Sequence, residues 1–169
     1  MLEIKETSND DLKNIQGLWS DKEVMANVGI PEGLSLSDDD MNNWYKSLAL
    51  KRPKSNHYSI YYDNNYCGEV HYNIDTSHSN IADLGIKLFS FARGSGIAYN
   101  SFSFIIEEVI KNRANVIYVD PNPKNKRAIA FYKKLGFIHK ETPDFIAKRY
   151  PQFDDYYMEL SNNYFKIHK

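Results

Sequence analysis

The sequence predicts one domain of mixed α/β structure, and three observations lead to that prediction. The chain has 169 residues, which is the size of a single ordinary domain. Apolar residues recur at helical spacing in some segments and alternate with polar ones in others, in the order β-α-α-β-β-β-α-β-α-β-β. No internal repeat, low-complexity tract or linker divides the sequence, so residues 1–169 are expected to fold as one unit.

The N-terminal third is expected to contain one strand and two helices. The strand covers residues 2–5, and the helices cover about 8–19 and 37–50. Each helix begins at a serine, whose hydroxyl can accept a hydrogen bond from an amide of the first turn. The segment 21–36 between the helices holds two glycines and a proline, which predicts an irregular connection.

The middle of the chain is expected to form an antiparallel meander of three strands. These strands cover residues 57–62, 66–74 and 81–89, with polar turns between them. Side chains of the second strand alternate between two faces. One face carries Gly68, Val70, Tyr72 and Ile74, and the other carries Cys67, Glu69, His71 and Asn73.

The remaining elements alternate between helices and short strands. Helices are expected over residues 96–112 and 125–135, and strands over 115–119, 137–140 and 155–160. Gly136 directly follows the second of these helices, where a glycine commonly ends a helix in the left-handed conformation.

Composition and charge argue against several classes of function. The 21 basic and 22 acidic residues leave a formal net charge of −1, too small to hold the chain on nucleic acid or an anionic membrane. The N-terminus lacks the apolar stretch of a signal peptide, and no apolar run approaches the roughly 20 residues that span a bilayer. The single cysteine, Cys67, permits no intramolecular disulfide. We therefore expect a cytoplasmic protein that binds neither nucleic acid nor a membrane.

A glycine-containing loop between an expected strand and an expected helix is the first functional candidate. Residues 89–98 read Phe-Ser-Phe-Ala-Arg-Gly-Ser-Gly-Ile-Ala. Successive backbone amides at a helix N-terminus form an anion site, and Gly94 and Gly96 leave room for a phosphate to approach them. Arg93 can add charge-assisted hydrogen bonds. The loop lacks the Gly-Lys-Ser/Thr of a Walker A motif, and a plain turn that starts a helix is the alternative interpretation.

A second motif follows about thirty residues later. Residues 119–137 read Val-Asp-Pro-Asn-Pro-Lys-Asn-Lys-Arg-Ala-Ile-Ala-Phe-Tyr-Lys-Lys-Leu-Gly-Phe, and Asn125 can cap the helix inside this segment. Packing explains the apolar face of that helix, which consists of Ala128, Ile129, Phe131, Tyr132 and Leu135. Packing does not explain why this segment follows the glycine loop in this order and at this distance.

Together the two motifs resemble those of the GNAT superfamily of N-acetyltransferases. Residues 93–98 resemble its Gln/Arg-x-x-Gly-x-Gly/Ala motif, and residues 125–137 resemble its second motif. Residues 18–25 and 82–88 are similar to the branch of ribosomal-protein N-terminal acetyltransferases, whereas 120–129 is closer to aminoglycoside 6′-N-acetyltransferases. The resemblance implies a GNAT-like fold. In that fold a central, mostly antiparallel sheet is splayed at the cofactor site and flanked by about four helices.

The resemblance also implies that acetyl-coenzyme A binds between two splayed strands, 81–89 and 115–119. Its pantetheine arm would pair with the backbone of Ile86 and Leu88, and Asn125 would contact this arm or only cap its helix. The pyrophosphate would lie on the amides of Arg93, Gly94, Ser95, Gly96, Ile97 and Ala98. No metal is expected, because the histidines lack the spacing of a ligand set.

By the same resemblance, an amine attacks the thioester directly. Tyr132 corresponds to the general acid of the family, which would protonate the coenzyme A thiolate; core packing is the alternative. Asp83, on the strand before the loop, is the first candidate for the base, and Glu69, His71 and water are the alternatives. Surface solvation or strand pairing would also account for each of these three side chains.

A small-molecule amine such as an aminoglycoside or a polyamine is the expected acceptor, with a protein N-terminus or lysine as the alternative. A non-catalytic acyl-coenzyme A-binding module is a third hypothesis, which an intact Tyr132 disfavours. Segments 21–50 and 141–156 are expected to form the acceptor site. The candidate residues are Trp19, which lies just before the first segment, and, within the two segments, Glu23, Glu32, Trp44, Tyr45, Asp144, Asp154 and Asp155. Aromatic residues make up 14% of the chain and are common both in cores and at subunit interfaces. We expect a homodimer.

Overall fold

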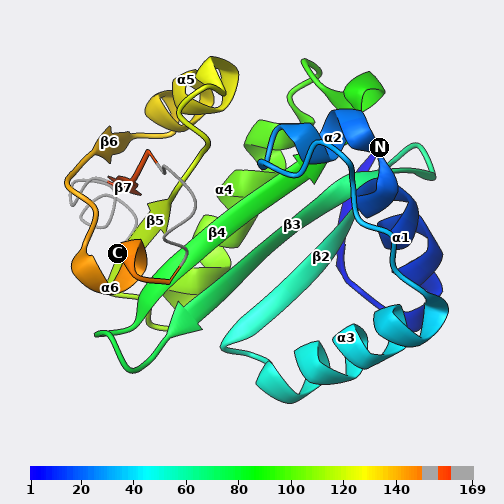
Figure 1. Cartoon of the computed structure of the whole chain (residues 1–169), viewed down its shortest axis with the longest axis horizontal. Coiled ribbons are helices and arrows are strands. Elements are labelled where there is room, and N and C mark those ends of the chain that lie inside the picture. Colours follow the sequence, from blue (N-terminus) through cyan, green and yellow to red (C-terminus); the bar gives the residue numbers. More distant parts are fainter. Residues whose placement is uncertain (150–155, 161–169) are drawn as a thin grey trace.

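Within residues 1–149 and 156–160, which the computed structural model describes, a seven-stranded sheet organises the chain (Figure 1). The strands are β1 (Leu2–Glu6), β2 (Ser55–Tyr62), β3 (Asn65–Asp75), β4 (Ile81–Leu88), β5 (Val116–Val119), β6 (Phe137–His139) and β7 (Met158–Leu160). Their order across the sheet is β1-β2-β3-β4-β5-β7-β6. Neighbouring strands are antiparallel, except that β4 and β5 are parallel. The predicted mixed, mostly antiparallel architecture is therefore confirmed.

Helices cover both faces of this sheet. The described part of the chain contains six α-helices: α1 (Leu12–Ser20), α2 (Lys22–Ala26), α3 (Asp38–Lys51), α4 (Ile97–Lys111), α5 (Lys126–Lys134) and α6 (Asp144–Ala147). Helices α1 to α3 lie on one side of strands β2 to β4, and α4 lies on the other side (Figure 1). None of the helices in the described ranges has the length and apolar character that a membrane span requires.

Two short helices were not expected from the sequence. The segment 21–36 was predicted to be irregular, but its first part forms α2 because the Asp21 carboxylate accepts a hydrogen bond from the Val24 amide at 2.9 Å. Val24 and Met25 are buried, which fixes the helix against its neighbours. Helix α6 is held on the β3–β4 turn, where Phe145 stacks on His78 with ring centroids 4.1 Å apart. Arg149, just after α6, pairs with Asp75 at 2.9 Å.

The two faces of the central strands differ in chemistry although both are covered. One face packs apolar side chains such as Val70 and Leu84 against α4, in the main hydrophobic core. The other face carries Glu69 and His71, as the alternation of β3 predicted, and Trp19 of α1 and Trp44 of α3 lie over it. Cys67, which the alternation placed beside them, packs in the main core instead, because the pairing of β3 with β2 shifts by one residue between Ile60 and Tyr61. The polar face is therefore not a solvated surface.

The sheet opens between β4 and β5. These strands pair only at the start of β4, where Ile81, Ala82 and Asp83 face residues 116–118. Beyond Asp83, the edge of β4 that faces β5 has no strand partner among the residues that the structure describes, because the ladder between the two strands has ended. The predicted splay therefore lies directly after the residue proposed as the base.

Candidate functional site

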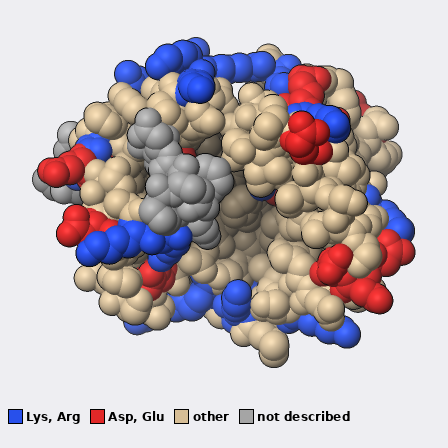
Figure 2. All heavy atoms as spheres, in the orientation of Figure 1, with Lys and Arg blue, Asp and Glu red and all other residues tan. Residues whose placement is uncertain are grey.

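A cavity of about 770 Å³ opens where β4 and β5 diverge. Its floor is the open half of β4, one wall is α2 with the turn after it, and the other wall is α5 with the 120–125 connection. Figure 2 shows a hollow between the two halves of the molecule, with basic side chains of α5 at its upper rim. A volume of this size is typical of small-molecule sites.

The floor offers backbone groups that pair with no strand in the described part of the chain, although the Leu88 carbonyl accepts from the Arg93 side chain. The Phe89 amide donates to the Cys67 carbonyl on β3 at 3.0 Å. In an antiparallel ladder, successive residues turn their N–H and C=O groups to opposite sides. The backbone groups of Ile86 and Leu88 therefore point away from β3, into the gap beside β5. This geometry is what main-chain pairing with a pantetheine arm requires, and that pairing remains a prediction.

The predicted phosphate loop is the start of α4. Gly94 and Gly96 have φ values of +87° and +81°, a conformation that favours glycine, and a Cβ added to either meets no atom within 4 Å. The first backbone hydrogen bond of the helix runs from the Asn100 amide to the Gly96 carbonyl. The amides of Ile97 and Ala98 therefore have no carbonyl partner within α4 and can bind an anion. Ala98 lines the cavity, whereas the Ile97 side chain belongs to the core.

Arg93 makes contacts that the sequence did not indicate. Its Nε and Nη2 donate to the Leu88 carbonyl at 3.2 and 3.1 Å, and its Nη1 donates to Glu23 of α2 at 2.8 Å. The side chain thus ties the loop to the end of β4 and to α2. Binding of a phosphate by Arg93 stays a prediction, since the guanidinium would have to share or leave these partners.

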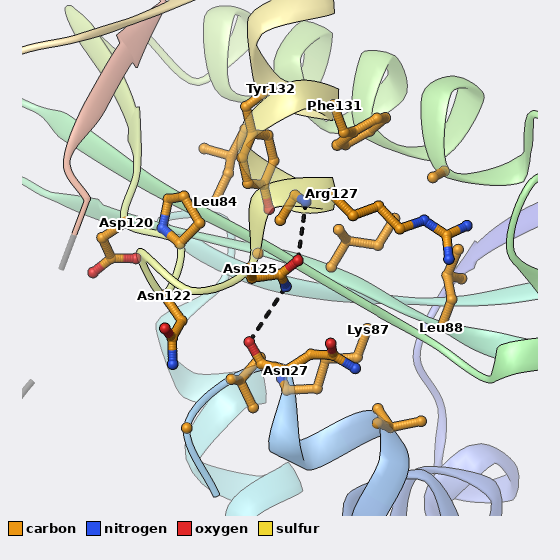
Figure 3. A pocket seen from close by; sticks show the side chains of 18 of the residues that line it. Asn27, Leu84, Lys87, Leu88, Asp120, Asn122, Asn125, Arg127, Phe131 and Tyr132 are labelled. Atoms are coloured by element: carbon orange, nitrogen blue, oxygen red, sulfur yellow. Dashed lines mark hydrogen bonds between the residues drawn. The ribbon is translucent and has the colours of Figure 1, made fainter. Parts of the chain in front are cut away.

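Tyr132 projects from α5 into the cavity (Figure 3). The side chain is 7% exposed, and its ring packs on Phe102 with centroids 5.2 Å apart. Burial, assisted by the negative charges of Asp120 and Asp83, raises the pKa of Tyr132 above its ordinary value. The phenol therefore keeps its proton at physiological pH, as a general acid must.

Asn125 joins the two walls of the cavity. Its Oδ1 accepts a hydrogen bond from the Ala128 amide at 3.0 Å, which is the predicted helix cap. Its Nδ2 donates to the carbonyl of Asn27, the residue directly after α2, at 3.5 Å (Figure 3). Contact between Asn125 and a pantetheine arm stays a prediction.

The three candidate bases have different surroundings. Asp83 and His71 line the cavity, but Glu69 does not. Glu69 is 0% exposed, so its interpretation as a solvated surface residue was wrong. Its carboxylate accepts hydrogen bonds from Trp19 at 2.9 Å, His57 at 2.8 Å and Lys87 at 2.7 Å. Burial alone would raise the pKa of Glu69, but the Lys87 ammonium and the His57 ring hold it well below its ordinary value.

The polar face also contains three potential metal ligands. Donor atoms of His57, Glu69 and His71 all lie within 4.8 Å of one another. The Lys87 ammonium already supplies the positive charge beside this carboxylate, and the His57 and Trp19 N–H groups occupy its other oxygen. Glu69 is therefore engaged by an internal ion pair and two further hydrogen bonds, whereas Nδ1 of His71 has no hydrogen-bond partner among the described residues.

Several residues expected at the acceptor site have other roles. Trp19 and Trp44 pack edge to face, with centroids 4.9 Å apart, and cover Glu69 and His57 instead of lining the cavity. Tyr45 and Asp144 also lie outside the lining, and Glu32 pairs with Lys22 at 3.1 Å. Asp154 and Asp155 lie outside the described residues.

Other residues of the cavity were not anticipated. The α2 side contributes Val24, Asn27, Val28 and Gly29, and the opposite side contributes Asp120, Arg127 and Phe131. Asp120 was visible in the sequence as the acidic residue that follows the 115–119 strand. The α2 residues carried no such signal, because a helix of five residues is too short to show a periodic pattern.

Comparison with known proteins assigns the family. The family model of the acetyltransferase (GNAT) domain matches residues 2–138. The chain belongs to the GNAT family. The protein is therefore an N-acetyltransferase, and the resemblance of its two motifs to this family is confirmed.

Solved structures share the fold of this GNAT protein. Aminoglycoside acetyltransferase AAC(6')-Ib in complex with ribostamycin and coenzyme A is 17% identical, with a TM-score of 0.77 over 98% of this chain and 96% of that chain. Spermidine N-acetyltransferase from Vibrio cholerae in complex with coenzyme A and spermine is 18% identical, with a TM-score of 0.73 over 94% and 91%. At these identities the comparison establishes the fold alone.

Proposed function

We propose that this GNAT enzyme transfers the acetyl group of acetyl-coenzyme A to a primary amine of a small, cationic molecule. One observation carries the proposal: a single cavity joins the open edge of β4 and the two ends of the phosphate loop, Arg93 and Ala98, to a buried phenol and two carboxylates. The first set suits the cofactor, and the second set suits a protonated amine.

The cofactor half is formed by backbone. The open edge at Ile86 and Leu88 suits the amide groups of pantetheine, and the amides at the start of α4 suit a pyrophosphate. Arg127 on the cavity wall adds positive charge on the same side. Both solved structures described above contain coenzyme A, which supports acetyl-coenzyme A as the donor.

The acceptor half is acidic. Asp83 and Asp120 line the cavity, and their negative charges add to the effect of burial in raising the pKa of Tyr132. A protonated amine is attracted to this region, whereas the Lys87 charge is engaged by Glu69. Relatives of the same fold were solved with spermine and with ribostamycin, both of which carry several amines. In this proposal Tyr132 donates the proton that the departing thiolate takes up.

Release of coenzyme A thiol across a panel of amines tests the proposal. The panel contains spermidine, spermine, kanamycin and ribostamycin, with peptides that offer a free N-terminus or a lysine as the protein-type acceptors. We expect kcat/KM for the best small amine to exceed that of every peptide by at least about 10-fold, which corresponds to about 1.4 kcal/mol of transition-state binding. Faster turnover of a peptide would establish a protein acetyltransferase instead. Stabilisation by coenzyme A without thiol release would support a binding module.

A matched variant separates recognition of charge from chemistry. Asp120→Asn keeps the shape of the side chain and removes one negative charge from the acceptor half. We expect KM for a polycationic amine to rise, while the thermal stabilisation by coenzyme A stays as in the wild type. Equal KM values for the two proteins would show that Asp120 does not attract the acceptor.

A further inference from the structure

His71 lies on the polar face, where its ring packs against β4 but its hydrogen bonds are not completed by the described residues. Its ring lies against Gly85 of β4, where an added Cβ would come within 2.6 Å of the ring atoms Cε1 and Nε2. Gly85 therefore leaves the space that the imidazole fills. Because Gly85 belongs to the half of β4 that β5 does not pair, the ring lies against the strand that forms the cavity floor.

The two ring nitrogens of His71 have different environments. Nδ1 is buried and has no hydrogen-bond partner in the described part of the chain, and it lies 3.9 Å from Oε1 of Glu69. The side chain as a whole is 34% exposed, and the residue lines the cavity. Nε2, on the edge beside Gly85, is therefore the nitrogen that can meet a ligand.

We propose that His71 is the catalytic base, with Nε2 accepting the proton that the acceptor amine loses, and that Glu69 is its positioning residue. This inference rests on the proposed function. The Glu69 carboxylate lies 3.9 Å from Nδ1, beyond hydrogen-bond distance, and its negative charge favours the imidazolium against burial and the Lys87 charge, which disfavour it.

The reaction begins when the bound ammonium group of the acceptor loses one proton to solvent and becomes the neutral amine. The lone pair of the neutral amine forms a C–N bond to the thioester carbon, and the C=O π pair moves to oxygen. Nε2 of His71 takes one proton from the new ammonium. The C=O bond then re-forms while the C–S bond breaks, and the thiolate takes a proton from Tyr132. Solvent afterwards takes the proton from His71 and restores the one on Tyr132.

The groups that face His71 keep its lone pair available. His57 stacks on the ring from β2 at a centroid distance of 5.9 Å, Glu69 lies behind it on β3, and Lys87 faces it from β4. Burial, with a further contribution from Lys87, lowers the pKa of His71 to about 3, so the imidazole is neutral throughout the assay range. The ammonium of the tetrahedral intermediate can still release its proton, because its carbon carries oxygen and sulfur and makes it more acidic than the free amine.

Glu69 and Asp83, the other two candidate bases, are placed less well to accept the proton. Glu69 is fully buried, and its oxygens already accept three hydrogen bonds, so it cannot reach an amine in the cavity. Asp83 belongs to the part of β4 that still pairs with β5, and it faces Tyr118 there. An aspartate at that position attracts the cationic acceptor, and the neutral imidazole over the open strand accepts the proton.

Chemical rescue distinguishes a base from a structural residue. His71→Ala leaves a ring-sized space beside Gly85 that added imidazole can enter, whereas pyrazole has the same shape but is a far weaker base. With the amine that the wild type turns over fastest, we expect His71→Ala to lower kcat by at least about 10²-fold, and imidazole but not pyrazole to restore at least about 10-fold. Thermal stabilisation by coenzyme A should match the wild type. His139→Ala, on β6, controls for direct effects of imidazole.

The outcomes separate the alternatives. His71→Ala with wild-type kcat, or with a lost kcat that imidazole does not rescue, overturns the inference. A larger loss of kcat in Asp83→Asn than in His71→Ala also overturns it, in favour of Asp83. If His71→Ala does not fold, His71→Gln takes its place, and we expect the same loss of kcat in that variant. The kcat of His71→Gln should also rise more steeply with pH than the kcat of the wild type. A wild type inactive towards every amine overturns the proposed function and this inference, whereas an active wild type leaves the proposed function standing.

Discussion

The ion pair between Glu69 and Lys87 makes a sharp prediction about stability. The two charges lie 2.7 Å apart, with side-chain exposures of 0% for Glu69 and 15% for Lys87. Glu69→Gln keeps an acceptor for the His57 and Trp19 N–H groups but leaves the Lys87 ammonium without its counter-charge. Removing one partner of a buried pair costs about 3–5 kcal/mol, and the partial exposure of Lys87 favours the lower end. In a domain of this size each kcal/mol lowers Tm by about 2–4 °C, so we expect a fall of about 6–12 °C.

The double variant Glu69→Gln/Lys87→Met shows whether the unpaired charge is the cause. Neither charge remains in it, so we expect most of the lost Tm to return. Glu32→Gln is the matched control, because the ion pair of Glu32 with Lys22 is exposed, and we expect a shift within about 2 °C. A Glu69→Gln protein that melts within about 2 °C of the wild type at pH 7 would refute the reasoning. A double variant no more stable than Glu69→Gln would do the same.

Acid provides an independent measurement of the same ion pair. The pKa of Glu69 is lower in the folded protein than in the unfolded chain, where it is about 4.3. The folded state therefore gains stability from this carboxylate above about pH 4.3 and loses the gain as pH falls towards the folded pKa. The difference in Tm between the wild type and Glu69→Gln should narrow below that pH.

Four further predictions concern catalysis, cofactor binding, acid stability and assembly. Tyr132→Phe should bind coenzyme A normally but lower kcat by about 10²-fold at pH 7. The loss of kcat should be smaller towards pH 9, because the thiolate can leave there without a proton. A Tyr132→Phe protein with the kcat of the wild type would show that Tyr132 is a packing residue. The wild type should gain about 2.7 kcal/mol at a coenzyme A concentration of 100 Kd, and Gly96→Val should lose most of this gain. Gly136→Val, with a φ of +96° outside the cavity, controls for backbone strain, and an equal loss in both variants would contradict the phosphate site. Because the pKa of His71 is held at about 3 in the folded state, wild-type stability should fall as pH drops from about 6.5 towards 3, and His71→Gln should lack this part of the slope. Light scattering should give a dimer mass, and a monomer mass across micromolar concentrations would contradict the expected homodimer.

Local chemistry explains why the conformation of the glycine loop and the cap of α5 were predictable. Gly94 and Gly96 adopt a positive φ at the start of α4, and Asn125 caps α5, so each residue acts within a few positions of itself. Alternation along β3 likewise placed Glu69 and His71 on one face. These features depend on backbone geometry, which short sequence patterns record.

Contacts between distant segments account for what the sequence did not reveal. Glu69 is buried because Trp19, fifty residues earlier, donates to it, and Arg93 meets Glu23 across seventy residues. The sequence contains these side chains but not the packing of α1 and α2 over β3 and β4. The same packing turned Trp19 and Trp44 from expected acceptor contacts into a cover over the polar face.

The interrupted pairing between β4 and β5 gives β4 two kinds of amide along a single strand. The amides of Gly85 and Lys87 point towards β3 and are bound in the ladder, whereas those of Ile86 and Leu88 point into the gap. Hydrogen–deuterium exchange of the ligand-free protein should therefore alternate from slow to fast at successive residues. A ligand that lies in the gap as an added strand should slow exchange at Ile86 and Leu88 and leave Gly85 and Lys87 unchanged. The missing stretch of ladder thus provides a residue-by-residue report on whether a bound molecule completes the sheet.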